Sequence, residues 1–127
     1  MSYYIFITRQ NIFESDPNPD QITYEEWSRV AEADPEFEVD DYGGGRKDFC
    51  WKAHPDRPLF EFFDSMGVGV RMRDMAICRK MFEIAGKLFA VVMGESSERY
   101  RLTDRGVEQY WEDPSDGPPT IVIPLDE

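Results

Sequence analysis

The sequence predicts an α+β fold, a mostly antiparallel sheet of about five to seven strands with two principal helices packed on it. Two observations lead to this class. Short segments rich in β-branched and aromatic residues recur along the chain, separated by turn formers. Two longer stretches space their apolar residues three or four apart, which is typical of amphipathic helices. We expect residues 1–113 to form a single α+β domain, followed by an acidic, proline-containing tail at 114–127 that is partly mobile or docked as an edge strand.

The N-terminal part of the chain predicts a buried strand, a loop and a capped helix. Residues 3–8 are apolar on both faces, which favours a central strand. Residues 10–21 hold a cluster of Asn, Asp and Pro and predict an exposed loop. Thr23 and Glu26 have the spacing of a capping box, so we expect a helix from residue 24 to about residue 33.

The rest of the chain predicts a series of short strands around a second helix. In residues 36–40 acids alternate with Phe37 and Val39, which indicates an amphipathic strand with an acidic outer row. Helical spacing returns from Asp74 to about Gly86. The other predicted strands are 47–52, 59–63, 68–72, 88–93, 98–102, 107–111 and the edge strand 121–123.

The distribution of charge limits the partners that this chain can bind. Its 26 acids and 14 bases leave a formal charge of -12, and the segment 111–127 has acids but no base. Binding to nucleic acid or to an anionic membrane depends on Lys and Arg, so we expect neither. A basic protein is the better electrostatic match.

No secretion signal or membrane-length apolar run is present, so we expect a cytoplasmic protein with both cysteines reduced.

Motifs that carry enzymatic chemistry are sparse. His54 is the single histidine, which excludes mechanisms that need several imidazoles. Cys50, His54 and Asp56 could form a partial metal site, but a structural thiol and a surface imidazole are the preferred interpretation. No phosphate-binding loop or dinucleotide motif is present, so we expect no catalytic residues, no metal and no cofactor.

Two groups of acids are the candidate partner-binding residues. The first lies on and after the predicted acidic strand, and the second flanks a pair of serines in a loop. Such acids most often form a solvated surface, and the alternative is a row of fixed negative charge for an incoming basic surface. The candidates are Glu36, Glu38, Asp40, Asp41, Glu95 and Glu98.

Several stretches match a pattern seen in small bacterial proteins. They are Tyr4–Arg9, Ile22–Trp27, Asp34–Glu36 and Lys80–Ala85, followed by scattered positions from Leu88 to Tyr100. In these stretches the chain resembles immunity-type proteins that accompany secreted or contact-delivered toxins. The resemblance implies a small domain that neutralises a cognate toxin, and the acidic balance is suited to a basic toxin such as a nuclease.

Two other classes of function remain open at this stage. A scaffold or interaction module would bind a cellular protein without protecting the cell against a toxin. A small hydrolase that uses carboxylates alone would need an acid with a raised pKa in a pocket.

Overall fold

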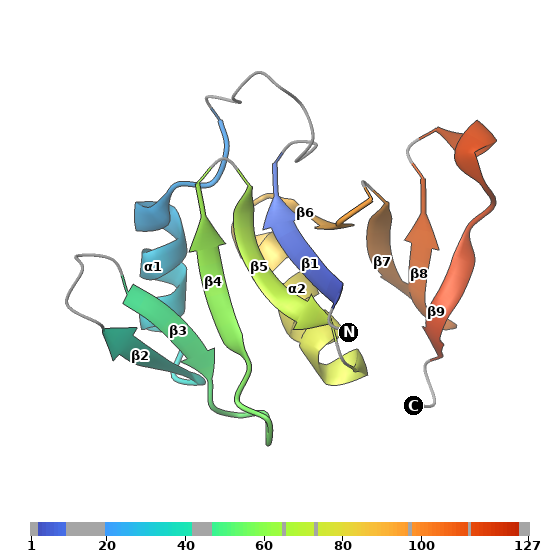
Figure 1. Ribbon diagram of the computed structural model, residues 1–127. Coiled ribbons are helices and arrows are strands. Elements are labelled where there is room, and N and C mark those ends of the chain that lie inside the picture. Colours follow the sequence, from blue (N-terminus) through green and yellow to red (C-terminus); the bar gives the residue numbers. More distant parts are fainter. Residues whose placement is uncertain are drawn as a thin grey trace.

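The structure, a computed structural model, describes residues 3–9, 20–41, 47–64, 66–72, 74–96, 98–111 and 113–124. Its elements follow one another mostly through tight connections (Figure 1). In chain order they are β1 (Tyr3–Thr8), α1 (Tyr24–Ala33), β2 (Phe37–Asp41), β3 (Lys47–Trp51), β4 (Leu59–Phe63), β5 (Gly67–Met72), α2 (Met75–Lys87), β6 (Val91–Gly94), β7 (Arg99–Thr103), β8 (Gly106–Tyr110), the 3-10 helix η1 (Pro114–Asp116) and β9 (Thr120–Pro124).

All strands of the described chain belong to one antiparallel sheet, ordered β2-β3-β4-β5-β1-β6-β7-β8-β9. The α+β class is confirmed, but the expected five to seven strands undercount the nine-stranded sheet. Strands that follow one another in the chain pair side by side from β2 to β5 and from β6 to β9, and β1 lies between β5 and β6. Every predicted strand segment therefore pairs in the sheet. The central position expected for β1 is confirmed.

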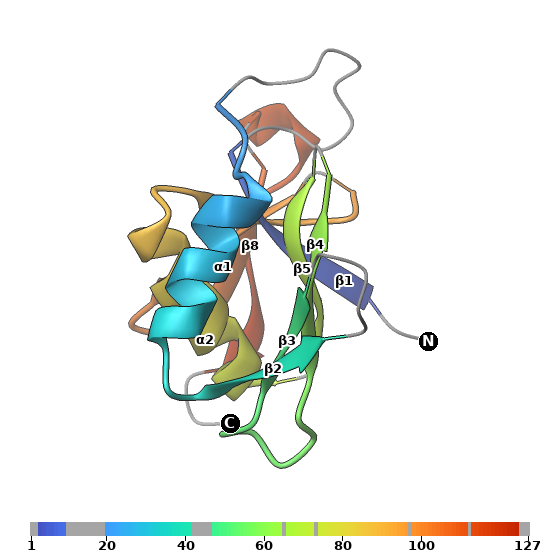
Figure 2. The same cartoon turned by 90° about the vertical axis from the view of Figure 1, so that its left-hand side faces the viewer.

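Both helices pack on the same face of the sheet, as the side view shows (Figure 2). Trp27 of α1 is fully buried and its ring contacts Phe37, Phe49 and Phe60 from β2, β3 and β4. The apolar side of α2 lies over β1, β6 and β7. No helix in the described ranges has the length and apolar composition that crossing a bilayer requires.

The predicted capping box at the start of α1 is confirmed. The Thr23 hydroxyl accepts the Glu26 backbone N–H at 3.1 Å, and the Glu26 carboxylate accepts the Thr23 backbone N–H at 3.0 Å. These two bonds satisfy donors that the first helical turn leaves without intrahelical partners. Of the predicted exposed loop at residues 10–21, residues 10–19 lie outside the described residues; Asp20 is exposed and Gln21 is buried.

One predicted strand starts in the wrong place. We expected a strand from residue 88, whereas α2 is capped by Leu88 and β6 begins only at Val91. Phe89 has a φ of 52°, in the left-handed region, which no extended strand contains. A run of apolar residues therefore includes both a helix end and a strand start, and periodicity alone does not separate them.

Candidate functional site

The first acidic group does not form a continuous row. Glu36 precedes β2, and its carboxylate accepts hydrogen bonds from Lys80 Nζ and Trp51 Nε1, each at 2.9 Å. These two bonds lower the pKa of Glu36. Glu38 is exposed and pairs with Arg57 at 3.1 Å. Of the two remaining candidates only the backbone is described: Asp40 and Asp41 end β2, opposite Asp48 and Lys47 of β3.

Lys80 is buried at the centre of a charged cluster in which Asp34 is buried and Glu36 and Glu83 are about half exposed. Its ammonium group lies 2.6 Å from Asp34, 2.9 Å from Glu36 and 3.0 Å from Glu83. Burial lowers the pKa of Lys80, but the hydrogen bonds to the three carboxylates outweigh that effect and raise it. A nucleophilic lysine needs the opposite shift. The cluster therefore ties α2 to the end of α1 and to β2, and we read it as structural.

The second acidic group is split between the surface and the interior. Glu95 is exposed and accepts the Tyr4 backbone N–H at 3.0 Å. Glu98 is buried, which removes it from an exposed acidic surface. Its carboxylate accepts hydrogen bonds from the Tyr3 hydroxyl, the Tyr100 hydroxyl and the Ser96 backbone N–H. Burial and the adjacent Glu98 raise the pKa of both tyrosines. Glu98 thus anchors the turn between β6 and β7.

The structure does not bring the two acidic groups together. Between β2 and β6 lie β3, β4, β5 and β1, so the two strands are five strand positions apart. At about 4.8 Å per position this separation is about 24 Å. The two predicted groups therefore lie on separate parts of the sheet, and their role in binding a partner stays a prediction. Glu38 and Glu95 are the two described candidates whose side chains are exposed away from the Lys80 cluster.

The Cys50, His54 and Asp56 stretch does not supply a metal site. His54 Nδ1 accepts the Asp56 backbone N–H at 3.0 Å, and Nε2 lies 2.8 Å from Asp74 Oδ2. Both ring nitrogens are therefore occupied. Among the described residues no group of three or more metal-ligating side chains converges. Cys78 is buried, and burial raises the pKa of its thiol to about 12, which leaves it a poor nucleophile.

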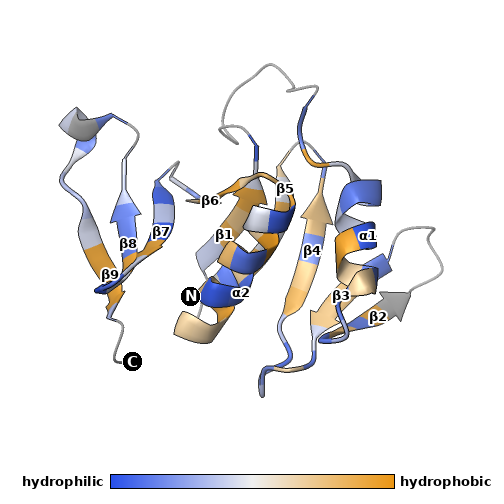
Figure 3. Ribbon diagram, turned by 180° about the vertical axis from the view of Figure 1, so that it is seen from behind, coloured by the Kyte–Doolittle hydropathy of each residue, from blue (hydrophilic) through white to orange (hydrophobic). Residues whose placement is uncertain are grey.

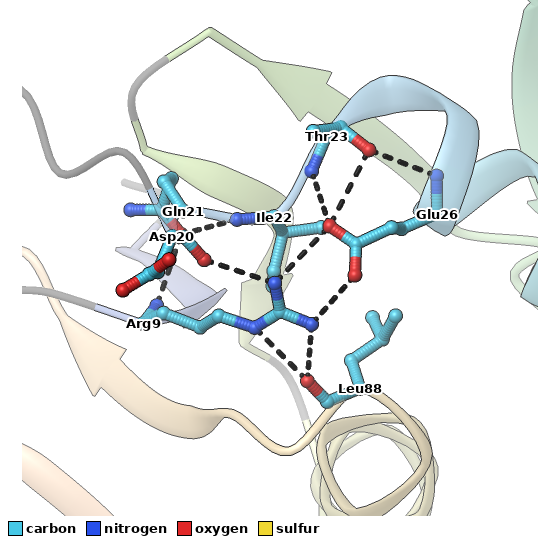
Figure 4. Close-up of polar contacts among 7 residues, drawn as sticks. All are labelled: Arg9, Asp20, Gln21, Ile22, Thr23, Glu26 and Leu88. Carbon is cyan, nitrogen blue, oxygen red and sulfur yellow. Dashed lines mark hydrogen bonds and ion pairs between the residues drawn. The ribbon is translucent and has the colours of Figure 1, made fainter.

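Arg9, directly after β1, joins the start of α1 to the end of α2 (Figure 4). Its Nη1 and Nη2 donate to the two carboxylate oxygens of Glu26 at 3.1 and 2.8 Å. Its Nε and Nη2 also donate to the Leu88 carbonyl at 3.0 and 2.6 Å. A bidentate guanidinium contact of this kind restricts both partners. Arg9 therefore holds the peptide group that leads into Phe89.

Phe89 is the most exposed large apolar side chain among the described residues. Its ring is 91% exposed, and its backbone has the left-handed conformation that glycine usually supplies after a helix. The Ala90 N–H donates to the Ala85 carbonyl at 2.9 Å, which is the long-range bond of a Schellman motif. An aromatic residue at this position is an outlier that costs free energy. The end of α2 therefore holds the backbone of Phe89 in a conformation that leaves its side chain in solvent.

A shallow groove of about 400 Å³ lies next to the end of α2, and Phe89 is not among the residues that line it. Gly86 of α2, Ala90 before β6, Leu102 of β7 and Tyr110 of β8 contribute to its lining. Leu102 is an exposed apolar side chain, and a Cβ at Gly86 would meet nothing within 4 Å. We call this surface, together with Phe89, the Phe89 groove.

The end of α2 reverses the usual placement of glycine. Glycine inside a helix costs about 1 kcal/mol relative to alanine, and Gly86 lies in the last turn of α2. The position that favours glycine, directly after the cap, holds Phe89 instead. Local preferences that fail together in one place are expected at functional sites. In the sequence, the stretch Gly-Lys-Leu-Phe was the available signal for this exchanged placement of glycine and phenylalanine. The interpretation as a helix end followed directly by a strand left that signal unrecognised.

Comparison of the chain with protein family models, with curated proteins and with solved structures found no match. The family resemblance in the sequence therefore remains a hypothesis, and the site has to be interpreted from its own geometry.

Proposed function

We propose that this chain is a protein-binding domain of the immunity type, which neutralises a toxin domain by occupying part of its surface. The observation that carries the proposal is Phe89, an aromatic side chain that is 91% exposed at the end of α2 and precedes Ala90, a residue that lines an apolar groove. Aromatic side chains that insert into a partner dominate the binding energy of many interfaces. Exposed apolar residues of this size, held in place at a cost in stability, are typical of interaction sites.

The way in which the backbone of Phe89 is held favours specific binding over non-specific hydrophobic association. Arg9 donates two hydrogen bonds to the preceding carbonyl, and the Schellman bond fixes the following residue. Backbone that is already restrained loses less conformational entropy when a partner buries the ring that it carries. Burying an exposed phenylalanine ring contributes about 1.5–3 kcal/mol, so Phe89 alone can account for a tenfold or larger part of an affinity.

The neutralising role is supported by charge and by the sequence resemblance. The excess of 26 acids over 14 bases favours a basic partner, because opposite charges accelerate encounter and reject acidic competitors. A nuclease toxin has such a surface, since it must hold phosphates. The exposed carboxylates of Glu38 and Glu95 are the described candidates for this steering. Glu38 already pairs with Arg57, so we expect it to affect association rate more than final affinity.

The proposal is tested with the toxin-like domain encoded beside the gene, produced separately and mixed with the complete chain. We expect nanomolar binding by titration calorimetry and protection of cells in which both proteins are expressed. Phe89→Ala should weaken binding by about tenfold or more. Val39→Ala is the matched control, because Val39 is another exposed apolar side chain, on β2 far from the groove. Equal affinity of the Phe89→Ala variant and the unmodified chain would remove Phe89 from the interface.

Charge reversal tests the electrostatic part separately. Glu38→Lys and Glu95→Lys should slow association at low salt, with a smaller effect at high salt, where surface charges are screened. Glu36 is left unchanged, because its reversal would break the Lys80 cluster and confuse binding with stability. If a pull-down from the source cells instead recovers a cellular protein, and no toxin domain is neutralised, the scaffold function replaces the immunity one.

A further inference from the structure

The two edges of the sheet differ in how they are protected. β2 forms one edge and β9 the other. Every strand edge has backbone N–H and C=O groups that a further strand could pair with, and proteins usually block this pairing with charged residues. β2 carries Glu38, Asp40 and Asp41 along its five residues. β9 reads Thr-Ile-Val-Ile-Pro and carries no charge.

The β9 edge is also apolar and uncovered. Both helices lie on one face of the sheet, and β8 and β9 extend beyond the part that they cover (Figure 1). Seen from behind, much of β9 has the colour of hydrophobic residues, whereas the adjacent β8 is mostly hydrophilic (Figure 3). Val122 is 39% exposed. It is the extra residue of a bulge, because Val107 pairs with Ile123 and the next residue, Glu108, pairs with Ile121.

The charge around β9 indicates what kind of strand fits there. The segment 111–127 contains five acids and no base, and β9 lies within it. Asp113 and Asp116, which precede the strand, are exposed. Pairing two copies of β9 would bring two acidic, base-free segments together, and like charges oppose that arrangement. A strand with basic residues at its ends would be attracted instead.

We propose that β9 is a docking edge for an extended strand of a partner protein, in which Lys or Arg flanks a short apolar core. Backbone hydrogen bonds to the edge provide affinity, and the surrounding acids select the basic flanks. Prolines at 118 and 119 precede β9, and the bulge at Val122 and Pro124 lie within it, so regular pairing covers fewer than its five residues and the added strand is short. This surface is distinct from the Phe89 groove, and its test does not require the toxin partner of the proposed function.

The experiment uses the complete chain and two synthetic peptides. One reads Lys-Lys-Thr-Val-Thr-Val-Lys-Lys, and in the other glutamate replaces each lysine. Hydrogen-deuterium exchange is followed residue by residue, with peptide concentrations up to about 1 mM, because a single short strand binds weakly. We expect the lysine peptide to slow exchange at residues 120–123 and the glutamate peptide to leave it unchanged.

A matched pair of variants locates the contact. Val122→Lys places a charge on the β9 edge, and Val39→Lys places the same charge at an equally exposed valine on the β2 edge, where relative exposure is 44%. Val122→Lys should weaken peptide binding by about tenfold, and Val39→Lys should not. Thr120→Lys, at an exposed position in β9, is a second test if Val122→Lys lowers the melting temperature.

The outcomes separate the proposal from its competitors. Equal protection by both peptides would overturn the charge selection, and protection outside β9 or none at all would overturn the docking edge. Protection of residues 120–123 that rises with protein concentration and needs no peptide would show pairing between copies, which also contradicts the proposal. None of these results depends on whether a toxin is neutralised.

Discussion

Replacing Phe89 with glycine is expected to stabilise the fold and to weaken partner binding at the same time. Phe89 is 91% exposed and its φ is 52°, so the substitution removes almost no packing and relieves a left-handed backbone. That conformation costs a side-chain-bearing residue about 1–2 kcal/mol. Part of the gain is offset by the greater freedom of glycine in the unfolded chain, which leaves a net stabilisation of about 1 kcal/mol.

The two effects are measured separately. Urea denaturation should give the increase in the free energy of unfolding, and thermal denaturation should show a melting temperature higher by about 4 °C. Binding to the toxin domain should weaken by about tenfold or more, since the contribution of the buried ring, about 1.5–3 kcal/mol, is lost. Phe89→Ala is the control: it loses the ring but keeps the strained backbone, so its stability should change little.

Opposite signs for stability and binding are the signature of a residue retained for an interaction. A glycine variant that is less stable than the unmodified chain would show that Phe89 contributes to the fold, and the reasoning from strain would be refuted. A glycine variant that is more stable but binds equally well would refute the assignment of Phe89 as a contact.

The remaining predictions concern the supports of the fold. Gly86→Ala should raise the free energy of unfolding by about 1 kcal/mol in urea denaturation, because the added Cβ meets nothing within 4 Å. A loss of stability would mean that other atoms already occupy the space beside Gly86 in the groove. Lys80→Met should cost about 3–5 kcal/mol by leaving the buried carboxylate of Asp34 unpaired, whereas Lys87→Met, on the exposed side of α2, should change little. Tyr100→Phe removes one donor to buried Glu98 and should cost about 1–3 kcal/mol in the same assay. Burial raises the pKa of Asp34, but the hydrogen bonds from Lys80 and a backbone N–H lower it by more, so the pKa in the folded chain is below the ordinary 3.8. Its contribution to stability is thus complete above that value and lost as the pH falls through the lower folded pKa, and urea midpoints measured downward from neutral pH should show this loss only in acid.

Much of the fold could be predicted because its signals are local. The Thr23 and Glu26 capping box lies three residues apart, and the strand Tyr3–Thr8 and helix Tyr24–Ala33 have the predicted bounds. Turn formers between short apolar runs predicted an antiparallel sheet, because antiparallel neighbours need only a brief connection. The strand count was too low because strand pairing is a property of the assembled sheet.

The candidate site was harder to predict, since its decisive contacts join distant parts of the chain. From the sequence Glu98 is expected to be a surface acid in a polar loop. In the fold its carboxylate is buried, and the Tyr3 hydroxyl, 95 positions earlier in the chain, is one of its hydrogen-bond donors. Glu36 reads as one of three alternating acids, yet it bonds Lys80 of α2. Sequence spacing reports which residues share a face, but not what that face meets.

The amino-acid sequence by itself determined the α+β class, the order of the elements and the acidic balance. These follow from periodicity, turn chemistry and charge, which act over a few residues or over the whole chain. Only the tertiary structure decided which acids are exposed, that Arg9 supports the end of α2 and that Phe89 projects into solvent. The physical reason is that burial and hydrogen bonding depend on which segments fold against one another, and that arrangement is settled by long-range contacts.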